Sequence, residues 1–279
     1  MRAITAGILV FIVAGAVLAN AACVCDGAFT TETRDDSFTV NGSAVLVASS
    51  ENGKIEVVAG SDDEVRVQAT LRGVERIDYD VSQDGSTITV EAKVHSGWNI
   101  GNRGVDITIT APASTDVDLA SSNGMVSLTG IEGSGTLRTS NGMVSLEDVK
   151  GDFEGTTSNG KLQITNMEGS GVFRSSNGRA ELQGVAGEFD VDTSNSGISF
   201  SGNFTAGSSN KLVTSNGKVD VELLGTPSVE LDASTSNGDI TCGFPITATT
   251  TGDDRLVGTI GDGEADLHIS SSNGDVTIR

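Results

Sequence analysis

The sequence predicts an all-β protein: a parallel β-solenoid with about 18–21 residues per coil and a β cap at its N-terminal end. Two observations support this prediction. The tripeptide Ser-Asn-Gly recurs at near-constant spacing, which is the signature of a repeat architecture. Each copy is followed by alternating apolar and polar residues, the period-two pattern of a half-buried strand. The 36 glycines and 3 prolines further favour short strands joined by tight turns.

The first 21 residues have the form of a signal peptide. Arg2 supplies the positive charge, residues 8–18 form an apolar run, and Ala19-Asn20-Ala21 matches the small-x-small pattern that precedes a cleavage site. We therefore expect an exported protein, located in the cell envelope, the periplasm or the extracellular space.

Two other interpretations of this segment stay open. The residues "NAAC" suit a lipoprotein signal that ends at residue 22, with Cys23 as the lipidated residue, although Asn20 replaces the usual aliphatic residue. The apolar stretch also approaches the ~20 residues of a membrane-spanning helix, so an uncleaved anchor is the third alternative. The following residues 22–36 are expected to form an exposed tether.

Residues 37–279 are predicted to form one β-solenoid domain, in which residues 37–115 are the N-terminal cap and first coil. This part contains the strand-like runs "GKIEVVAG", "EVRVQATL", "STITVEAKV" and "VDITITAP". Asn52 and Gly53 look like a degenerate first repeat, because Ile55 and Val57 follow at the spacing of the later repeats.

Residues 116–279 contain the regular repeats, whose asparagines are separated by 18, 18, 18, 18, 21, 21 and 36 residues. These asparagines are Asn123, Asn141, Asn159, Asn177, Asn195, Asn216, Asn237 and Asn273. One coil per repeat would stack equivalent residues about 4.8 Å apart. Residues 242–270 interrupt the last repeats, and we expect them to form a hairpin or flap that closes the open end.

The predicted core consists of the apolar residues three and five positions after each asparagine. They are Val126, Leu128, Val144, Leu146, Leu162, Ile164, Ala180, Leu182, Ile198, Phe200, Val219, Val221, Ile240, Cys242, Val276 and Ile278. The positions between them are mostly polar and are expected to face solvent.

Two structural roles explain why the tripeptide recurs: it forms a sharp turn in each coil, and its asparagine can stack on the asparagines of neighbouring coils. Asn and Gly tolerate positive φ, so they suit a turn that is repeated at the same height in every coil. Stacked asparagine side chains can also hydrogen-bond the copies above and below them, which predicts an internal ladder of the eight asparagines. The Ser or Thr two residues before each asparagine is expected to point inward beside it.

The composition argues against some function classes. With 17 basic and 38 acidic residues the net charge is −21, which repels phosphate backbones and makes nucleic acid a poor partner. The three cysteines, Cys23, Cys25 and Cys242, form neither a disulfide framework nor a zinc-binding pattern. We expect no cofactor and no bound metal.

No constellation of residues indicates catalysis. The two histidines, His95 and His268, are far apart in the sequence, and no Gly-x-Ser-x-Gly motif is present. The enzymatic alternative is a polysaccharide lyase or hydrolase on a β-helix, which requires carboxylates at a defined separation. The adjacent carboxylates are Asp35-Asp36, Asp62-Asp63 and Asp253-Asp254. Neighbours on a strand face opposite ways, which argues against their acting together.

An outward column two residues after each asparagine is a candidate ligand strip, although its members are of mixed type. They are Met125, Met143, Lys161, Arg179, Gly197, Lys218, Asp239 and Asp275. The simpler interpretation of this column is an unselected surface.

A family resemblance rests on the opening around residues 47–57, the run "VDITITAP" and the following "LASSNGMVSL". With these segments the chain resembles the bacterial "putative adhesin" domains of unknown function, which are related to auto-transporter adhesin head domains. The resemblance covers residues 40–279. It implies a single-stranded right-handed β-helix on an exported or envelope protein, without known catalytic residues.

These observations together predict a non-enzymatic, exported β-solenoid that acts as an adhesin or scaffold. Its expected partner is a glycan or protein of a cell surface. Contact with a membrane is expected only through an N-terminal lipid or anchor, and the oligomeric state stays open.

Overall fold

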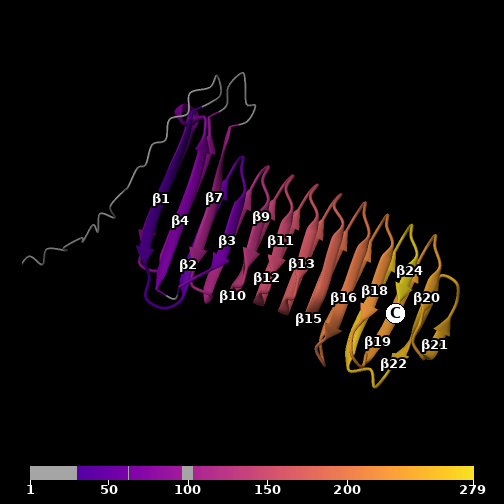
Figure 1. Ribbon diagram of the computed structural model, residues 1–279. Helices are drawn as coiled ribbons and strands as arrows, with labels where there is room; N and C mark the ends of the chain where they lie inside the picture. The colour runs from indigo at the N-terminus through magenta and orange to yellow at the C-terminus, as the bar shows by residue number, and fades with distance from the viewer. Residues whose placement is uncertain (1–29, 62, 96–102) are drawn as a thin grey trace, which may run out of the picture.

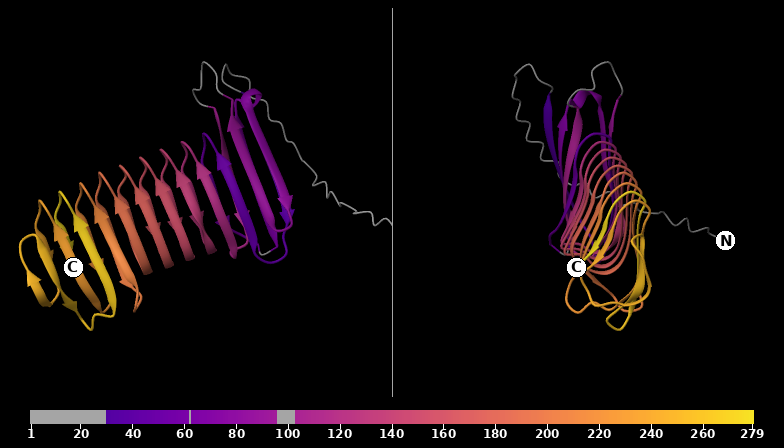
Figure 2. Two further views of the ribbon diagram at one scale, coloured as in Figure 1. Left: turned by 180° about the vertical axis from the view of Figure 1, so that it is seen from behind. Right: turned by 90° about the vertical axis from the view of Figure 1, so that its right-hand side faces the viewer.

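The protein forms an elongated stack of β-strands (Figure 1). The computed structural model describes residues 30–61, 63–95 and 103–279. The described part contains 24 strands and one 3-10 helix, in a mostly parallel sheet that curves nearly closed around the long axis (Figure 2). The predicted all-β class and parallel stacking are confirmed. The predicted signal peptide, Cys23 and the first part of the tether lie outside the described residues.

The strands fall into three groups along the chain. The N-terminal group is β1 Thr31–Thr39, β2 Ala44–Ser50, β3 Ile55–Ala59, β4 Glu64–Arg72, the 3-10 helix Val74–Arg76, β5 Ile77–Asp84, β6 Thr87–Val94 and β7 Gly104–Ala111. The central group is β8 Thr115–Ser121, β9 Val126–Thr129, β10 Glu132–Thr139, β11 Val144–Glu147, β12 Lys150–Thr157, β13 Leu162–Thr165, β14 Glu168–Ser175, β15 Ala180–Thr193, β16 Ile198–Phe204, β17 Ser209–Thr214 and β18 Val219–Leu223. The C-terminal group is β19 Val229–Thr235, β20 Ile240–Cys242, β21 Thr247–Thr251, β22 Arg255–Ile260, β23 Ala265–Ser271 and β24 Val276–Ile278.

From β8 to β14 each coil consists of one long and one short strand, whereas β15 continues from the short row into the long row. The long strands β8, β10, β12 and β14 pair in parallel in one row, and the short strands β9, β11 and β13 pair in parallel in a second row. In both rows each residue lies opposite the residue 18 positions later in the chain. Leu137 lies opposite Gly155 in the long row, and Val144 lies opposite Leu162 in the short row. The Ser-Asn-Gly turn joins each long strand to the short strand of the same coil. Seen along the axis, the coils overlay one another (Figure 2).

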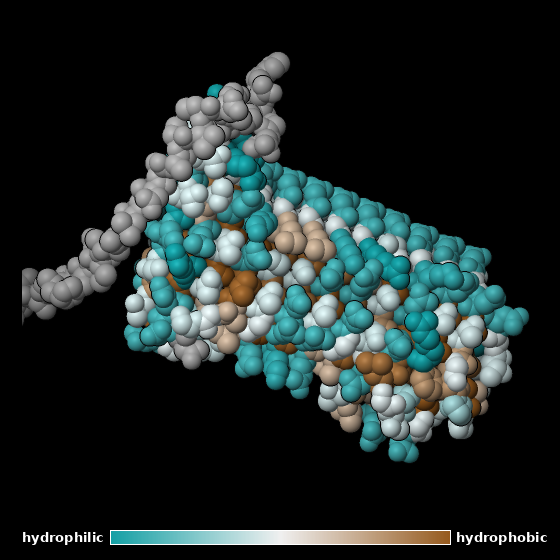
Figure 3. Space-filling view, in the orientation of Figure 1, coloured by the Kyte–Doolittle hydropathy of each residue, from teal (hydrophilic) through white to brown (hydrophobic). Residues whose placement is uncertain are grey.

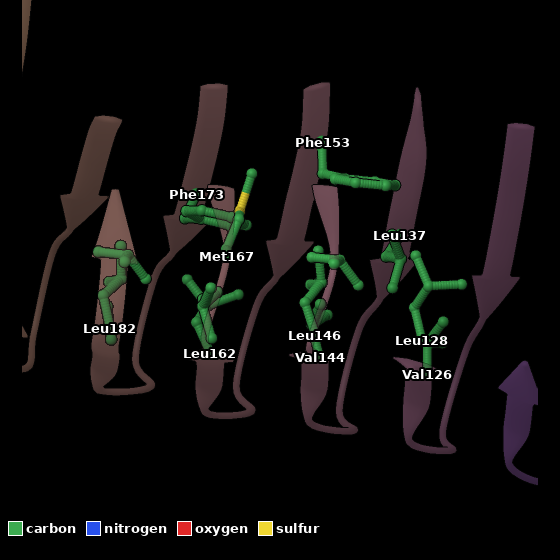
Figure 4. Close-up of a cluster of buried hydrophobic side chains, with 14 of the residues drawn as sticks. Val126, Leu128, Leu137, Val144, Leu146, Phe153, Leu162, Met167, Phe173 and Leu182 are labelled. Carbon is green, nitrogen blue, oxygen red and sulfur yellow. The ribbon is translucent and has the colours of Figure 1, made fainter. Parts of the chain in front are cut away.

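The core lies between the two rows of strands. All the predicted core residues are buried except Ile240 and Cys242, which are half-buried because β20 is at the edge of its row. Figure 4 shows equivalent side chains repeating from coil to coil. Large and small residues alternate in the long row: a Cβ added to Gly155 would lie 2.8 Å from the ring of Phe173 in the next coil. The phenylalanine therefore fills the space that the glycine leaves.

The first coils are not stacked in the order of the sequence. β2 lies between β6 and β8, and β3 lies between β7 and β9. The Asn52 turn therefore stacks directly against the Asn123 turn, although 71 residues separate them. Beyond these coils, the antiparallel strands β4 and β1 extend one row and β5 extends the other.

The predicted exposed tether is wrong in its last residues. Residues 31–36 belong to β1, which pairs antiparallel with β4 over its whole length. Asp35 accepts a hydrogen bond of 2.8 Å from Arg66 Nε on β4, so this strand is anchored by side chains as well as by its backbone. A polar sequence without strong alternation concealed a strand whose partner is remote in the chain.

The C-terminal coil is also inserted into the stack. β23 lies between β17 and β19, and β24 lies between β18 and β20. Residues 242–270 contain the antiparallel hairpin β21–β22, and β22 pairs with β19 at the end of the long row. The repeats are therefore not stacked in the order of the sequence at either end of the rod.

The glycine of each turn is required for close stacking. A Cβ added to Gly160 would lie 1.6 Å from the carbonyl oxygen of Gly142 in the neighbouring coil. Positive φ, which we expected at this corner, occurs there only at Gly53. The left-handed residues lie instead at the second corner, between short and long strands. They are Gly130, Asp148, Asn166 and Gly184, with φ between 53° and 73°.

We expect Gly160→Ala to destabilise the protein by at least about 2 kcal/mol, because the added methyl overlaps a backbone atom that cannot move without separating two coils. Gly243→Ala is the matched control, since its added Cβ would meet no atom closer than 3.5 Å and its φ is not positive. Thermal or urea unfolding of both variants checks this expectation. Equal stability of the two variants would show that the turn does not need glycine for close approach.

Candidate binding surface

The asparagine side chains of the turns form one column along an edge of the rod, where a hydrophilic ridge is visible in Figure 3. Each amide Nδ2 donates to Oδ1 of the next asparagine, at 2.7 Å from Asn141 to Asn123 and from Asn159 to Asn141. In space the column runs Asn52, Asn123, Asn141, Asn159, Asn177, Asn195, Asn216, Asn273 and Asn237. Asn52 belongs to it, and the last two follow the inserted coil rather than the sequence.

The asparagine ladder is exposed, which corrects the expectation that it is internal. The residues that point into the core are the Ser or Thr two positions earlier, at the end of each long strand, such as Thr139 and Thr157. Asn141 and Asn159 come after the strand has ended, so strand alternation no longer decides their direction. The ladder therefore lies on the outside of the corner, and the hydroxyls lie on the inside.

The inner hydroxyls form a second row of hydrogen bonds. Thr157 Oγ1 donates to the carbonyl oxygen of Gly142 in the preceding coil at 3.0 Å and accepts the N–H of Gly160 in its own turn at 3.0 Å. Thr139 makes the equivalent bonds with Gly124 and Gly142. One buried hydroxyl therefore satisfies a donor and an acceptor of two turns, where water has little access.

The two rows should differ in their contribution to stability. Asn159→Leu removes two exposed amide contacts that water replaces, and we expect a loss of about 0.5–1 kcal/mol. Thr157→Val leaves a buried N–H and a buried C=O without their hydroxyl partner, and we expect a larger loss of about 1–3 kcal/mol. Chemical unfolding of both variants measures the difference. A greater loss for the leucine variant would contradict the assignment of the hydroxyls as the stronger row.

A groove lies on the outer side of the short strands β13, β15, β16 and β18, near the middle of the rod. We call it the short-strand groove, and its volume is about 370 Å³. It is lined by Gln163, Ile164, Thr165, Arg179, Glu181, Leu182, Gln183, Ser199, Ser201 and Glu222. The hollow exists because Ser199 and Ser201 are small and lie directly beside the longer side chains of Glu181 and Gln183 in the neighbouring coil.

The groove combines paired charges with unpaired polar groups. Glu181 accepts contacts from Lys161 Nζ at 2.6 Å and from Arg179 Nε at 3.6 Å. Among the described residues, the side chains of Gln183, Ser199 and Ser201 have no hydrogen-bond partner. Amide and hydroxyl groups that face solvent without a protein partner can bind an external polar ligand. Of the predicted ligand strip, the groove contains Arg179.

A second, more open hollow of about 410 Å³ lies on the long-strand side, close to the turns. It is lined by Ser49, Ser50, Glu51, Ala92, Lys93, Ala120, Ser121, Ser122, Arg138, Thr139, Ser140, Thr156 and Ser158. Small alanine and serine side chains from several coils produce it. Arg138 at its border contacts Asp118 at 3.4 Å.

A half-buried ion pair of the N-terminal coils is centred on Asp106 of β7. Its carboxylate accepts hydrogen bonds from the guanidinium of Arg72 on β4 and from the N–H of Lys54 at 3.1 Å. Burial alone would raise the pKa of the Asp106 carboxyl, but these hydrogen bonds and the nearby positive charges together lower that pKa below its ordinary value. The interaction ties β7 to β4 on one side and to the residue before β3 on the other.

Asp106 should make stability depend on pH. Because its pKa is lower in the folded chain, the ionised group stabilises the fold above about pH 3.9, the ordinary pKa of Asp, and this contribution is lost as the pH falls through the folded pKa. We expect Asp106→Asn to lower the melting temperature at neutral pH, with the difference from the wild type shrinking in acid. Asp80→Asn on exposed β5 is the control. A difference that is constant with pH would contradict an ionised, hydrogen-bonded Asp106.

The residues considered for catalysis or metal binding do not come together. Within residues 30–61, 63–95 and 103–279, no group of three or more His, Cys, Asp and Glu side chains could hold a metal ion. His95 lies beside Asp78 at the N-terminal end, and His268 lies beside Asp232 near the C-terminal end. Cys242 is a free, half-buried thiol. No helix in the described part is both long and apolar enough to span a bilayer.

Comparisons with known proteins identify relatives by sequence and by structure. A family model described as "Toastrack DUF4097" matches residues 44–279, which confirms the resemblance found in the sequence. No curated protein matches the chain significantly. Among crystal structures, a "putative adhesin" from Bacteroides fragilis is 14% identical, with a TM-score of 0.39, over 89% of this chain and 97% of the other.

Two further crystal structures are similar at lower TM-scores. A "putative cell adhesion protein" from Clostridium sporogenes is 11% identical, with a TM-score of 0.29, over 88% of this chain and 99% of the other. A "putative lipid binding protein" from Parabacteroides distasonis is 12% identical, with a TM-score of 0.28, over 89% of this chain and 97% of the other.

Proposed function

The chain belongs to the DUF4097 toastrack family, and from this premise we propose that it is a non-enzymatic, exported adhesin or scaffold of the cell envelope. The observation that carries the proposal is the arrangement of the coils. Parallel strands that pair residue by residue hold outward side chains in rows about 4.8 Å apart, on a long support fixed by hydrogen bonds. Such rows suit weak, repeated contacts with an extended polymer.

We infer that the chain winds as a single-stranded, right-handed β-helix, since crossover connections between parallel strands are almost always right-handed. Export follows from the proposed signal peptide of residues 1–21. Attachment to a membrane would use either lipidated Cys23 or an uncleaved N-terminal segment. A mass measurement of the mature protein distinguishes these three forms.

The short-strand groove is the proposed binding site, and its chemistry favours a neutral glycan. The groove is lined by one positive residue, Arg179, and two negative residues, Glu181 and Glu222, and Lys161 beside the groove pairs with Glu181. These four charges balance, on a chain of net charge −21. Gln183, Ser199 and Ser201 offer amide and hydroxyl groups to the hydroxyls of a sugar. A phosphate-rich polymer would be repelled by the surrounding acidic surface.

Binding to purified cell-wall and host-surface glycans tests the proposal. We expect the double variant Gln163→Ala and Gln183→Ala to weaken binding at least about fivefold, the factor that corresponds to losing about 1 kcal/mol of hydrogen bonding. Thr156→Ala, on the long-strand side, is the matched control and should bind like the wild type.

The outcomes separate the alternatives. If the groove variant binds a glycan as tightly as the wild type, the binding site lies outside the short-strand groove. If the wild-type protein binds no surface, only the scaffold role remains. Release of reducing ends or unsaturated sugars during the incubation would contradict a non-enzymatic role and support a carbohydrate-active enzyme instead.

A further inference from the structure

The turns that build the rod are chemically reactive dipeptides. In an Asn-Gly pair, the backbone nitrogen of glycine can attack Cγ of asparagine. The N–Cγ bond forms, the Cγ–Nδ2 bond breaks, and the amide nitrogen leaves as ammonia with the proton from the glycine nitrogen. Water then opens the succinimide ring to aspartate or isoaspartate. The chain contains nine Asn-Gly pairs: eight lie in the ladder and one, Asn41-Gly42, lies outside it.

The interior of the ladder holds both reacting groups in place. Asn159 Nδ2 donates to Asn141 at 2.7 Å, and Asn159 Oδ1 accepts from Asn177 at 2.8 Å. The nucleophile, the Gly160 nitrogen, donates its proton to Thr157 at 3.0 Å. Ring closure therefore requires the amide to leave two neighbours and the glycine N–H to leave a buried hydroxyl.

The same arrangement protects three other interior pairs. The N–H groups of Gly124, Gly142 and Gly178 donate to Ser121, Thr139 and Ser175 at 2.9–3.1 Å. The turn also cannot shift easily, because Cβ positions on these glycines would lie 1.5–1.8 Å from backbone oxygens of the neighbouring coil. Each of these reactive pairs is thus fixed in a conformation that must open before it can cyclise.

Asn237 is different because it is the last member of the ladder. Its Nδ2 donates to Asn273 at 3.0 Å, but among the described residues no asparagine donates to its Oδ1. Thr235 donates to the Gly274 carbonyl, and no hydroxyl of the described chain accepts the N–H of Gly238. The turn glycines Gly53, Gly217 and Gly274 share this feature, so the end position in the ladder is what distinguishes Asn237 from Asn216 and Asn273. The short strand that follows, β20, is an edge strand with half-buried core residues, so this coil opens more easily than the interior ones.

We propose that Asn237 is a site of spontaneous deamidation in the folded protein, together with Asn41, and that the interior pairs at Asn123, Asn141, Asn159 and Asn177 are protected by the ladder. Asn41 is exposed in the turn between β1 and β2 and outside the column. Deamidation of Asn237 replaces a donor with a carboxylate beside the exposed Asp239 and opposite the Asn273 amide oxygen. The rod is therefore chemically weakest at the end coil formed by β19 and β20.

Peptide mapping by mass spectrometry after incubation of the full chain in warm, mildly alkaline buffer tests the proposal. We expect Asn41 and Asn237 to convert first, and the four interior asparagines to convert at least about tenfold more slowly, since several hydrogen bonds must open before attack. In urea, where the fold is lost, all six should convert at similar rates. Equal rates in the folded chain, or an interior asparagine converting before Asn237, would overturn the proposal.

Two variants test the role of the hydroxyl within one molecule. Thr157→Val should accelerate conversion of Asn159 relative to Asn123 in the same sample, whereas Thr157→Ser should leave the ratio unchanged. Both conversion rates are measured in the same sample. A general loss of stability would therefore raise both rates and would not change the ratio of Asn159 to Asn123. If Asn159 converts no faster relative to Asn123 in the folded valine variant, the hydroxyl does not protect the glycine nitrogen.

Discussion

Coils that pair in register lie about 4.8 Å apart, and the Ser-Asn-Gly corner has to repeat within that spacing at every level of the rod. A side chain on the glycine would overlap the backbone of the next coil, as the 1.6 Å separation computed for a Cβ on Gly160 shows. The corner therefore tolerates no substituent at this position. Close stacking, rather than an unusual backbone angle, is what keeps glycine there.

The same spacing distributes the remaining polar groups of the turn between two sides. A Thr or Ser hydroxyl on the inside reaches a donor in its own turn and a carbonyl in the preceding one, as Thr157 does. The asparagine amide on the outside reaches its copies and, in several turns, a backbone carbonyl of the neighbouring turn, as Asn216 Nδ2 reaches the Ser194 carbonyl at 3.3 Å. Two rows of similar regularity thus do different things: the inner row satisfies buried backbone, and the outer row orders an exposed edge. The short-strand groove is possible because this scaffold is uniform and a pair of small serines interrupts one outward row.

Open strand edges at the ends of a parallel stack invite association with other strands. At the N-terminal end antiparallel strands close both rows, with β4 and β1 on one row and β5 on the other. At the C-terminal end β22 and β21 close the long row, whereas β20 is the edge of the short row among the described strands. The coils β2–β3 and β23–β24 are set inside these ends. These two coils are therefore held by coils on both of their sides, which opposes fraying of the rod.

The sequence by itself determined the repeat length, the alternation and the inward residues of the strands, because backbone pairing in register forces identical spacing onto every coil. It also identified the asparagines that stack, although it placed them on the wrong side of the corner, since alternation ends where the strand ends. Only the tertiary structure decided that β1 is a strand, that a groove forms beside Ser199 and Ser201, and which coils are neighbours. The order of coils could not be predicted because every coil carries the same turn and the same pairing edges. The repeated turn alone therefore does not specify that Asn52 stacks on Asn123 or that Asn273 stacks on Asn216.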